Sequence, residues 1–215
     1  MSNVISLLNI KTNKKKSTPV SSFGTQPTAK IHPSATVTGN VYLGKRVFLA
    51  ASASVCADMK RPIWIGDDVT IDNSAVVLAL EVDLRELVPT GTVEVEGQSY
   101  GVYIDDRAII TPQSQIHSPV SIGSDTYVGM QSLIFRAIIG SNCIIEPKAL
   151  VMGVEIDNGR YVPPGAVITT QAAADALPLV PRHHLLRDLE GVAARVEPLP
   201  STSDRQKIEP ESKIA

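Results

Sequence analysis

One histidine, His117, lies in the stretch ITPQSQIHSPVSIGSDTYVGM, which runs from Ile110 to Met130. A neutral imidazole can bind a transition metal or act as a general base, so His117 is the residue of this stretch best suited to chemistry. A catalytic zinc needs three protein ligands and an open fourth position, and it then lowers the pKa of a bound water to about 7. Whether His117 has such partners depends on the fold around it.

The aliphatic residues around His117 recur at every sixth position. The longest run consists of Ile104, Ile110, Ile116, Ile122, Val128 and Ile134. The same period is present from Ile31 to Val55, from Ile65 to Val77 and from Ile139 to Val151, and a small or β-branched residue such as Cys143 follows most members by four positions. A period of six fits neither a helix nor an alternating strand, and it is typical of a parallel β-helix. We expect an all-β fold in which Cys143 is a buried, unreactive thiol.

The pattern divides the chain into segments. Residues 31–180 form the predicted β-helix, interrupted at residues 80–103 by a protruding loop with a hairpin turned at Glu96 and Gly97. Residues 181–197 place aliphatic side chains on one helical face, which predicts a C-terminal α-helix lying back along the β-helix. Residues 1–30 contain lysines but no acidic residue, which indicates a disordered basic arm or a docking or targeting peptide. Residues 198–215 are polar and form a predicted flexible tail.

Composition narrows the function classes. The chain has 215 residues, a formal net charge of −2 and 43% hydrophobic residues, as expected for one domain with a sizeable core. No apolar run approaches the roughly 20 residues of a membrane span. The lysine run at residues 14–16 is too short to predict nucleic-acid binding. The two cysteines form no CxxC motif, which favours a reduced intracellular protein and leaves a single disulfide open.

Four longer segments resemble one known family. They read SQIHSPVSIGSDTYVGMQSLIF, GSNCIIEPKALVMGV, DNGRYVPPGAVITTQAAADALP and VEVEGQSYGVYI. Together with the repeat, from about Ile31 to Pro178, they resemble the gamma-class carbonic anhydrases and the N-terminal domain of the carboxysomal scaffolding protein. The resemblance implies a left-handed parallel β-helix, a C-terminal helix packed alongside and a trimer. It also implies zinc sites between subunits, each with two histidines from one chain and a third from its neighbour.

The sequence departs from the family at the positions of these ligands. Leu78 stands where the first histidine belongs and Pro112 where the second belongs, and only His117 matches the third. Leucine and proline side chains have no lone pair to offer a metal, so two of the three zinc ligands implied by the resemblance are missing. We therefore expect no catalytic residue and no bound cofactor.

Residues that support the metal in the family differ as well. The family's Arg-x-Asp motif reads Cys56-Ala57-Asp58, which keeps the aspartate alone. The glutamine that hydrogen-bonds the zinc-bound hydroxide is replaced by Asp72, whereas an acid of the proton-transfer loop is retained as Glu81. We expect Asp58, Glu81 and His117 to lie at a subunit interface.

These observations favour a catalytically inactive trimer with a scaffolding role in a larger protein assembly, one linked to inorganic-carbon handling. The trimer is predicted to be homomeric, or mixed with an active paralogue, and to lie in the cytoplasm, a carboxysome or a membrane-associated complex. One alternative is an active carbonic anhydrase with a zinc site rebuilt around His117 from Cys56 or Asp72. The other is a hexapeptide acyltransferase that uses His117 as general base towards acyl-CoA.

Overall fold

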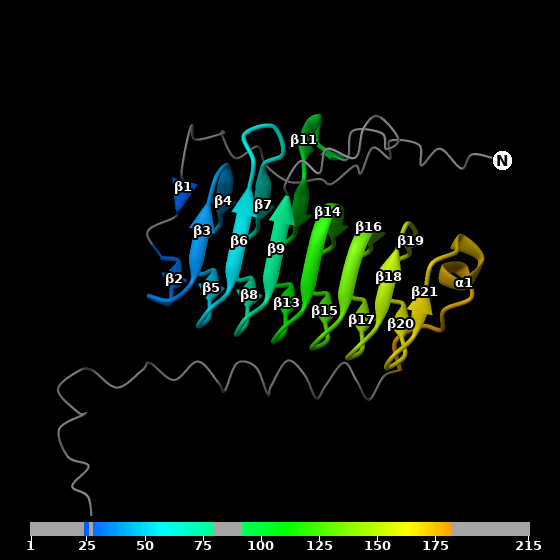
Figure 1. Ribbon diagram of the computed structural model, residues 1–215. Helices are drawn as coiled ribbons and strands as arrows, with labels where there is room; N and C mark the ends of the chain where they lie inside the picture. The colour runs from blue at the N-terminus through cyan, green and yellow to red at the C-terminus, as the bar shows by residue number, and fades with distance from the viewer. Residues whose placement is uncertain (1–23, 26–27, 80–91, 182–215) are drawn as a thin grey trace, which may run out of the picture. The chain divides into compact units, whose positions relative to one another are not determined.

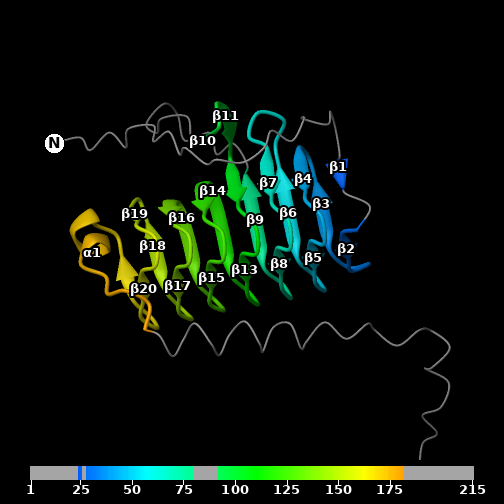
Figure 2. The ribbon, with the colours of Figure 1, turned by 180° about the vertical axis from the view of Figure 1, so that it is seen from behind.

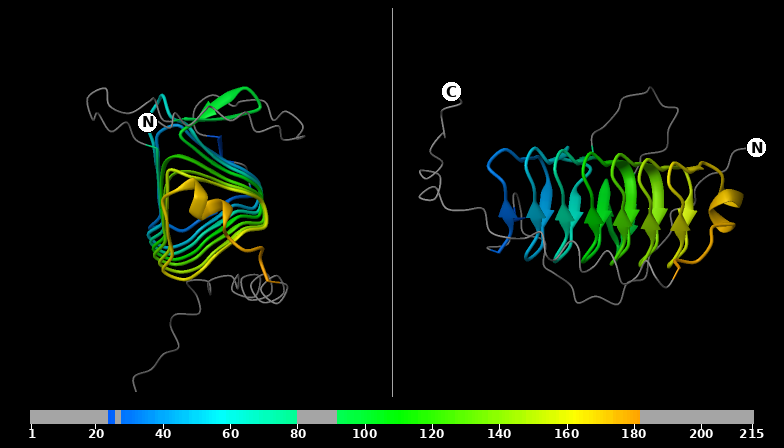
Figure 3. Two further views of the ribbon diagram at one scale, coloured as in Figure 1. Left: turned by 90° about the vertical axis from the view of Figure 1, so that its right-hand side faces the viewer. Right: turned by 90° about the horizontal axis from the view of Figure 1, so that it is seen from below.

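The computed structural model describes residues 24–25, 28–79 and 92–181. The chain divides into two units, Met1–Val180 and Pro181–Ala215. In the first unit, the described residues form a parallel β-solenoid in which short strands stack coil upon coil (Figures 1 and 2). Viewed along the axis of the solenoid, each coil is triangular (Figure 3). The left-handed parallel β-helix that the sequence predicted is confirmed.

One side of the triangle, face C, is a seven-stranded parallel sheet with one strand from each coil. Its strands are β2 (Lys30–Ile31), β5 (Phe48–Leu49), β8 (Thr70–Ile71), β13 (Ile109–Ile110), β15 (Tyr127–Val128), β17 (Ile144–Ile145) and β20 (Tyr161–Val162).

The other two sides are joined because β14 (Gln115–Ile122) and β16 (Leu133–Ile139) run around the corner between them, with a register shift after His117. Face A consists of β3 (Thr36–Thr38), β6 (Ser54–Ala57), β9 (Val76–Ala79), the first halves of β14 and β16, β18 (Leu150–Met152) and β21 (Val167–Ile168). Face B consists of β1 (Gly24–Thr25), β4 (Val41–Leu43), β7 (Ile63–Ile65), β12 (Val102–Ile104), the second halves of β14 and β16, and β19 (Glu155–Ile156).

The six-residue period sets the interior of the solenoid. Its aliphatic residues point inward and stack on their equivalents in neighbouring coils, so that Ile110, Ile116 and Ile134 have no exposed surface. Cys143 occupies a small interior position, is fully buried, and its thiol has a pKa raised by burial. The chain turns from one face to the next through residues with positive φ, such as Gln113 at 61°. These tight turns allow each side of a coil to consist of a strand of only two or three residues.

The predicted hairpin is present. Strands β10 (Val93–Val95) and β11 (Gln98–Tyr100) pair antiparallel, and both turn residues have positive φ, 52° at Glu96 and 75° at Gly97, as a two-residue type I′ turn requires. The hairpin packs on Trp64 and Tyr103 of face B, whose rings stack 6.5 Å apart. The coil resumes at Val102, so the interruption ends earlier than residue 103; residues 80–91 lie outside the described residues.

The ends of the solenoid also differ from expectation. Strand β1 and Lys30, the first residue of β2, lie inside the range 1–30 assigned to an arm, and these strands pair with β4 and β5 of the next coil. A short helix that was not predicted, α1 (Gln171–Asp175), follows the last coil, with Thr170 as its N-cap. The predicted helix at 181–197 and the tail at 198–215 lie outside the described residues, Pro181 excepted. Within the described part of the chain, no helix is long and apolar enough to cross a membrane.

Candidate functional site

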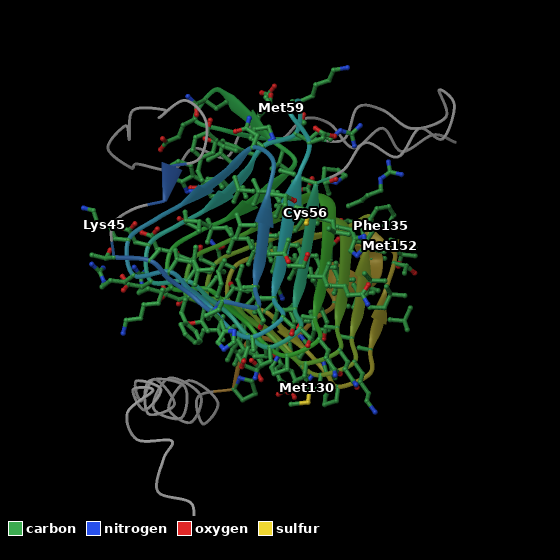
Figure 4. The ribbon with its side chains drawn as sticks, turned by 60° about the vertical axis from the view of Figure 1, so that its left-hand side comes forward. Lys45, Cys56, Met59, Met130, Phe135 and Met152 are labelled. Atoms are coloured by element: carbon green, nitrogen blue, oxygen red, sulfur yellow. The ribbon has the colours of Figure 1, made fainter. Side chains whose placement is uncertain are left out.

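His117 lies on face A, in a row of outward side chains that runs along the solenoid. In register, Cys56 pairs with Leu78, Leu78 with His117 and His117 with Phe135. The complete row is Thr38, Cys56, Leu78, His117, Phe135 and Met152. Figure 4 labels Cys56, Phe135 and Met152, which follow one another along this face. We call these six residues the His117 row.

The imidazole of His117 lies in apolar surroundings. Its Nε2 atom is buried and has no hydrogen-bond partner among the described residues. Burial lowers the pKa of the imidazole below its ordinary value, because removing water disfavours the charged form. The lowered pKa favours the neutral imidazole, and no other described group bonds its Nε2 atom.

The residue beside His117 that would have to supply a second metal ligand is apolar. Leu78 lies one strand spacing, about 4.8 Å, from His117 in the same row, close enough for two side chains to share a metal ion. A leucine offers no lone pair, and Phe135 on the other side of His117 offers none either. The His117 row does not fit a zinc ion.

Pro112 lies at the other edge of face A, in the turn between faces C and A. The turn continues through Gln113 in the left-handed region, and the Pro112 carbonyl accepts a 3.1 Å hydrogen bond from the Gln131 amide of the next coil. Pro147 and Pro164 precede the corresponding positive-φ residues of two later coils. Proline suits this turn position because its ring fixes φ near −65°. Turn geometry thus accounts for Pro112, whose side chain offers no atom to bind a metal.

The residues proposed for a rebuilt site are not near His117 within one chain. Cys56 lies two strand spacings away, about 10 Å, and its Sγ is 3.3 Å from the Ser54 hydroxyl. Asp72 lies in the turn at the Pro112 edge, where its Oδ1 accepts a hydrogen bond from the Asn73 amide. Across residues 24–25, 28–79 and 92–181, no three His, Cys, Asp or Glu side chains are grouped so as to hold a metal ion.

Asp58 begins the loop that follows β6, at the same edge of face A as His117. Its Oδ1 accepts hydrogen bonds from the amides of Lys60 and Arg61 at 2.8 and 2.7 Å. Its Oδ2 is buried without a hydrogen-bond partner in the described structure. A buried carboxylate oxygen without a partner is unfavourable. A contact with another subunit would supply a partner, and this interface contact at Asp58 remains a prediction. Glu81 lies outside the described residues.

Face A as a whole presents a surface that the sequence reasoning did not single out. None of its described outward residues is an acid, a lysine or an arginine. Towards β21 these outward positions become aliphatic or aromatic, at Leu133, Phe135, Leu150, Met152 and Val167. Met152 and Val167 are exposed, and the other three are half-buried. This apolar surface could have been predicted from the triplets LIF at residues 133–135 and LVM at residues 150–152, in which apolar residues flank the inward aliphatic residue of the repeat.

Comparison with known proteins gives relatives at the level of sequence. No protein-family model matches the chain. It is 41% identical over 170 residues to a carbonic anhydrase of Methanosarcina thermophila, covering 78% of this chain and 67% of that protein. It is 39% identical over 155 residues to the carboxysome assembly protein CcmM of Synechococcus elongatus, covering 72% of this chain and 27% of that protein. For CcmM of Nostoc, the identity is 34% over 150 residues, covering 70% and 26%.

Among solved structures, the acetyltransferase domain of PglB from Neisseria gonorrhoeae, in complex with acetyl coenzyme A, aligns with a TM-score of 0.41 and 17% identity, covering 71% of this chain and 58% of that chain. A hexapeptide transferase family protein from Anaplasma phagocytophilum aligns with a TM-score of 0.38 and 18% identity, covering 68% and 82%.

The coils and their period place the chain among the left-handed β-helix proteins with hexapeptide repeats. Within that class, it belongs to the gamma-class carbonic anhydrase family. It spans about two thirds of the Methanosarcina enzyme's length and about a quarter of the carboxysome assembly proteins. The chain thus combines the fold of this family with a leucine beside His117 on face A.

Proposed function

We propose that this chain is a catalytically inactive, trimeric member of the family that serves a structural role in a larger assembly. The observation that carries this proposal is the register of Leu78 with His117 on face A. Where two adjacent coils would place two metal ligands from one chain, this chain places one histidine and one leucine. With Pro112 in the turn that would supply the third ligand, a zinc-bound water could not be held by three protein side chains.

The surface of face A supports the trimer. Its outward residues are uncharged and increasingly apolar towards β21, and charged residues are depleted in the centres of protein interfaces. A second copy of this chain, or an active paralogue in a mixed trimer, would cover Leu133, Phe135 and Leu150. The similarity to carboxysome assembly proteins supports a setting in inorganic-carbon handling, with other proteins of that assembly as partners.

Metal content tests the inactive state directly. Untagged protein purified without chelator should contain no stoichiometric transition metal by elemental mass spectrometry, and His117→Ala should give the same result. Stopped-flow CO2 hydration should not exceed the buffer rate. Zinc near one per chain that is lost in His117→Ala would contradict the proposal.

The neutral, unpartnered His117 Nε2 favours one second candidate, a metal site rebuilt at a subunit interface. Neutral imidazole is the form that binds metals. Since Cys56 and Asp72 lie away from His117 in one chain, they would have to come from a neighbouring subunit. Metal lost in Cys56→Ser or Asp72→Asn as well as in His117→Ala would support this candidate. Metal retained in both variants would exclude these two side chains as ligands.

Assembly can be tested apart from metal binding. Leu150→Lys places a charge in the apolar part of face A, and an unpaired charge buried in an interface is unfavourable by several kcal/mol. Light scattering after gel filtration should show a trimer for the native chain and smaller species for Leu150→Lys. Ile109→Lys is the matched control, because Ile109 is an outward, half-buried aliphatic residue of face C, another side of the triangle, and should leave the trimer intact. A native monomer, or a trimer that tolerates Leu150→Lys, would contradict an interface on face A.

A further inference from the structure

The end of the solenoid next to α1 is closed by specific contacts. The Gln171 side-chain amide bonds both main-chain groups of Glu155, accepting from its N–H at 2.9 Å and donating to its carbonyl at 2.8 Å, as a further strand would. The Tyr161 amide donates to the Pro178 carbonyl at 2.9 Å. Ala174 and Leu177 are buried over the last coil. The edge strands β19 and β20 and the interior side chains of the last coil are covered at this end.

The opposite end has no such cover among the described residues. Strands β1, β2 and β3 each pair with a single strand, on the side of the next coil. The amides of Lys30 and Thr36 donate to carbonyls of that coil, both at 2.8 Å. Because successive residues of a parallel strand direct their main-chain groups to opposite sides, the amides of Ile31 and Val37 face away from it. Among the described residues, the outer edge of the first coil is therefore unpaired.

The interior of the first coil is exposed at this edge as well. Ile31 begins the six-residue repeat and is 40% exposed, whereas Leu49, its partner in the next coil, is fully buried. Val37 is half-buried, whereas Val55 above it is fully buried. An edge that combines unpaired main-chain groups with apolar side chains is a template for strand addition, and natural proteins cover such edges.

We propose that residues 4–10 of this chain, VISLLNI, add to β2 and β3 and cover the open end of the solenoid. Five of these seven residues are branched aliphatics, which suit both a strand and an apolar cap. The segment is attached at the open end of the solenoid, because the described chain enters the solenoid there through β1. Residues 11–23 span up to about 43 Å when extended, enough to return the segment across a coil.

The tether favours this segment over a second copy of the chain. A segment joined through a short linker acts at an effective concentration in the millimolar range, whereas a second molecule loses translational and rotational freedom on binding. Two copies meeting end to end would also bring the exposed Lys30 of each close to the other. This proposal concerns the β-helix itself and does not depend on the proposed inactive state.

Residue-resolved hydrogen–deuterium exchange on the full chain tests the proposal. The amides of Ile31 and Val37 should be protected in the native chain, like those of Lys30 and Thr36. In the double variant Leu7→Asp/Leu8→Asp, the exchange of Ile31 and Val37 should become at least about tenfold faster, with Lys30 and Thr36 much less affected.

The matched control is Ser17→Asp/Thr18→Asp, which adds the same charge outside residues 4–10 and should leave all four amides protected. Unprotected Ile31 and Val37 amides in the native chain would overturn the proposal, since the end would then be open to water. Protection that survives Leu7→Asp/Leu8→Asp and rises with protein concentration would also overturn it, in favour of a second copy.

Discussion

Histidines placed at positions 78 and 112, where the family resemblance implies two zinc ligands, should create a metal site. In Leu78→His/Pro112→His, the new imidazole at position 78 lies one strand spacing, about 4.8 Å, from that of His117. The new imidazole at position 112 lies at the opposite edge of face A, too far to share a metal with His117 of its own chain, and in the proposed trimer it would supply a ligand to a neighbouring subunit. The double variant should take up about one zinc per trimer interface. Either single variant, with two of the three ligands, should bind much more weakly.

The expected size of the effect follows from linkage. A ligand that binds only the folded state stabilises it by about 2.7 kcal/mol when its free concentration is 100 times Kd. For a domain of about 150 residues, 1 kcal/mol shifts Tm by roughly 2–4 °C. Zinc at that concentration should therefore raise the Tm of the double variant by about 5–11 °C. The native chain, with only His117 of the three, should show no shift.

Differential scanning fluorimetry with and without zinc measures this shift, and elemental mass spectrometry gives the stoichiometry. Circular dichroism and light scattering establish that each variant is folded and assembled. A folded, trimeric double variant that takes up no zinc would refute the placement of Leu78 and Pro112 at the ligand positions. A native chain stabilised by zinc to the same extent would refute the inactive state.

Three further predictions concern single positions. Ile116→Ala should lower the free energy of unfolding by about 2–5 kcal/mol in denaturant titrations, because the side chain is fully buried, whereas Met59→Ala, at 80% exposure, should change it by less than about 0.5 kcal/mol. Burial lowers the pKa of His117, so on acidification the unfolded chain takes up a proton at this histidine at a higher pH than the folded chain does. The free energy of unfolding should therefore fall as the pH drops through about 6.5, and His117→Gln should flatten that part of a Tm–pH profile. In Cys56→Ser, the remaining thiol of Cys143, whose pKa is raised by burial, should react with a maleimide only after denaturation. Labelling of the native Cys56→Ser protein, or a profile unchanged by His117→Gln, would contradict the respective placement.

The sequence predicted the architecture well because the solenoid is built from local repetition. A period of six, with an aliphatic residue and a small residue at fixed positions, specifies a coil from neighbouring residues alone. The turn at Glu96 and Gly97 was predictable for a similar reason, since two residues that accept positive φ between alternating strands define the hairpin. The closing helix α1 was not predicted because its five residues are too few to show a helical period.

The sequence by itself determined that leucine stands at position 78 and proline at position 112, and that neither side chain can bind a metal. Only the tertiary structure decided where those positions lie: Leu78 beside His117 in one row, and Pro112, Cys56 and Asp72 away from it. It also decided that the Nε2 atom of His117 is unpartnered among the described residues, that the described part of face A is uncharged, and that the first described coil has an open edge. The physical reason is that the repeat encodes the 18-residue spacing of His117 and Phe135, which is three periods of six, whereas Leu78 lies 39 positions before His117, across the interruption where the period is broken.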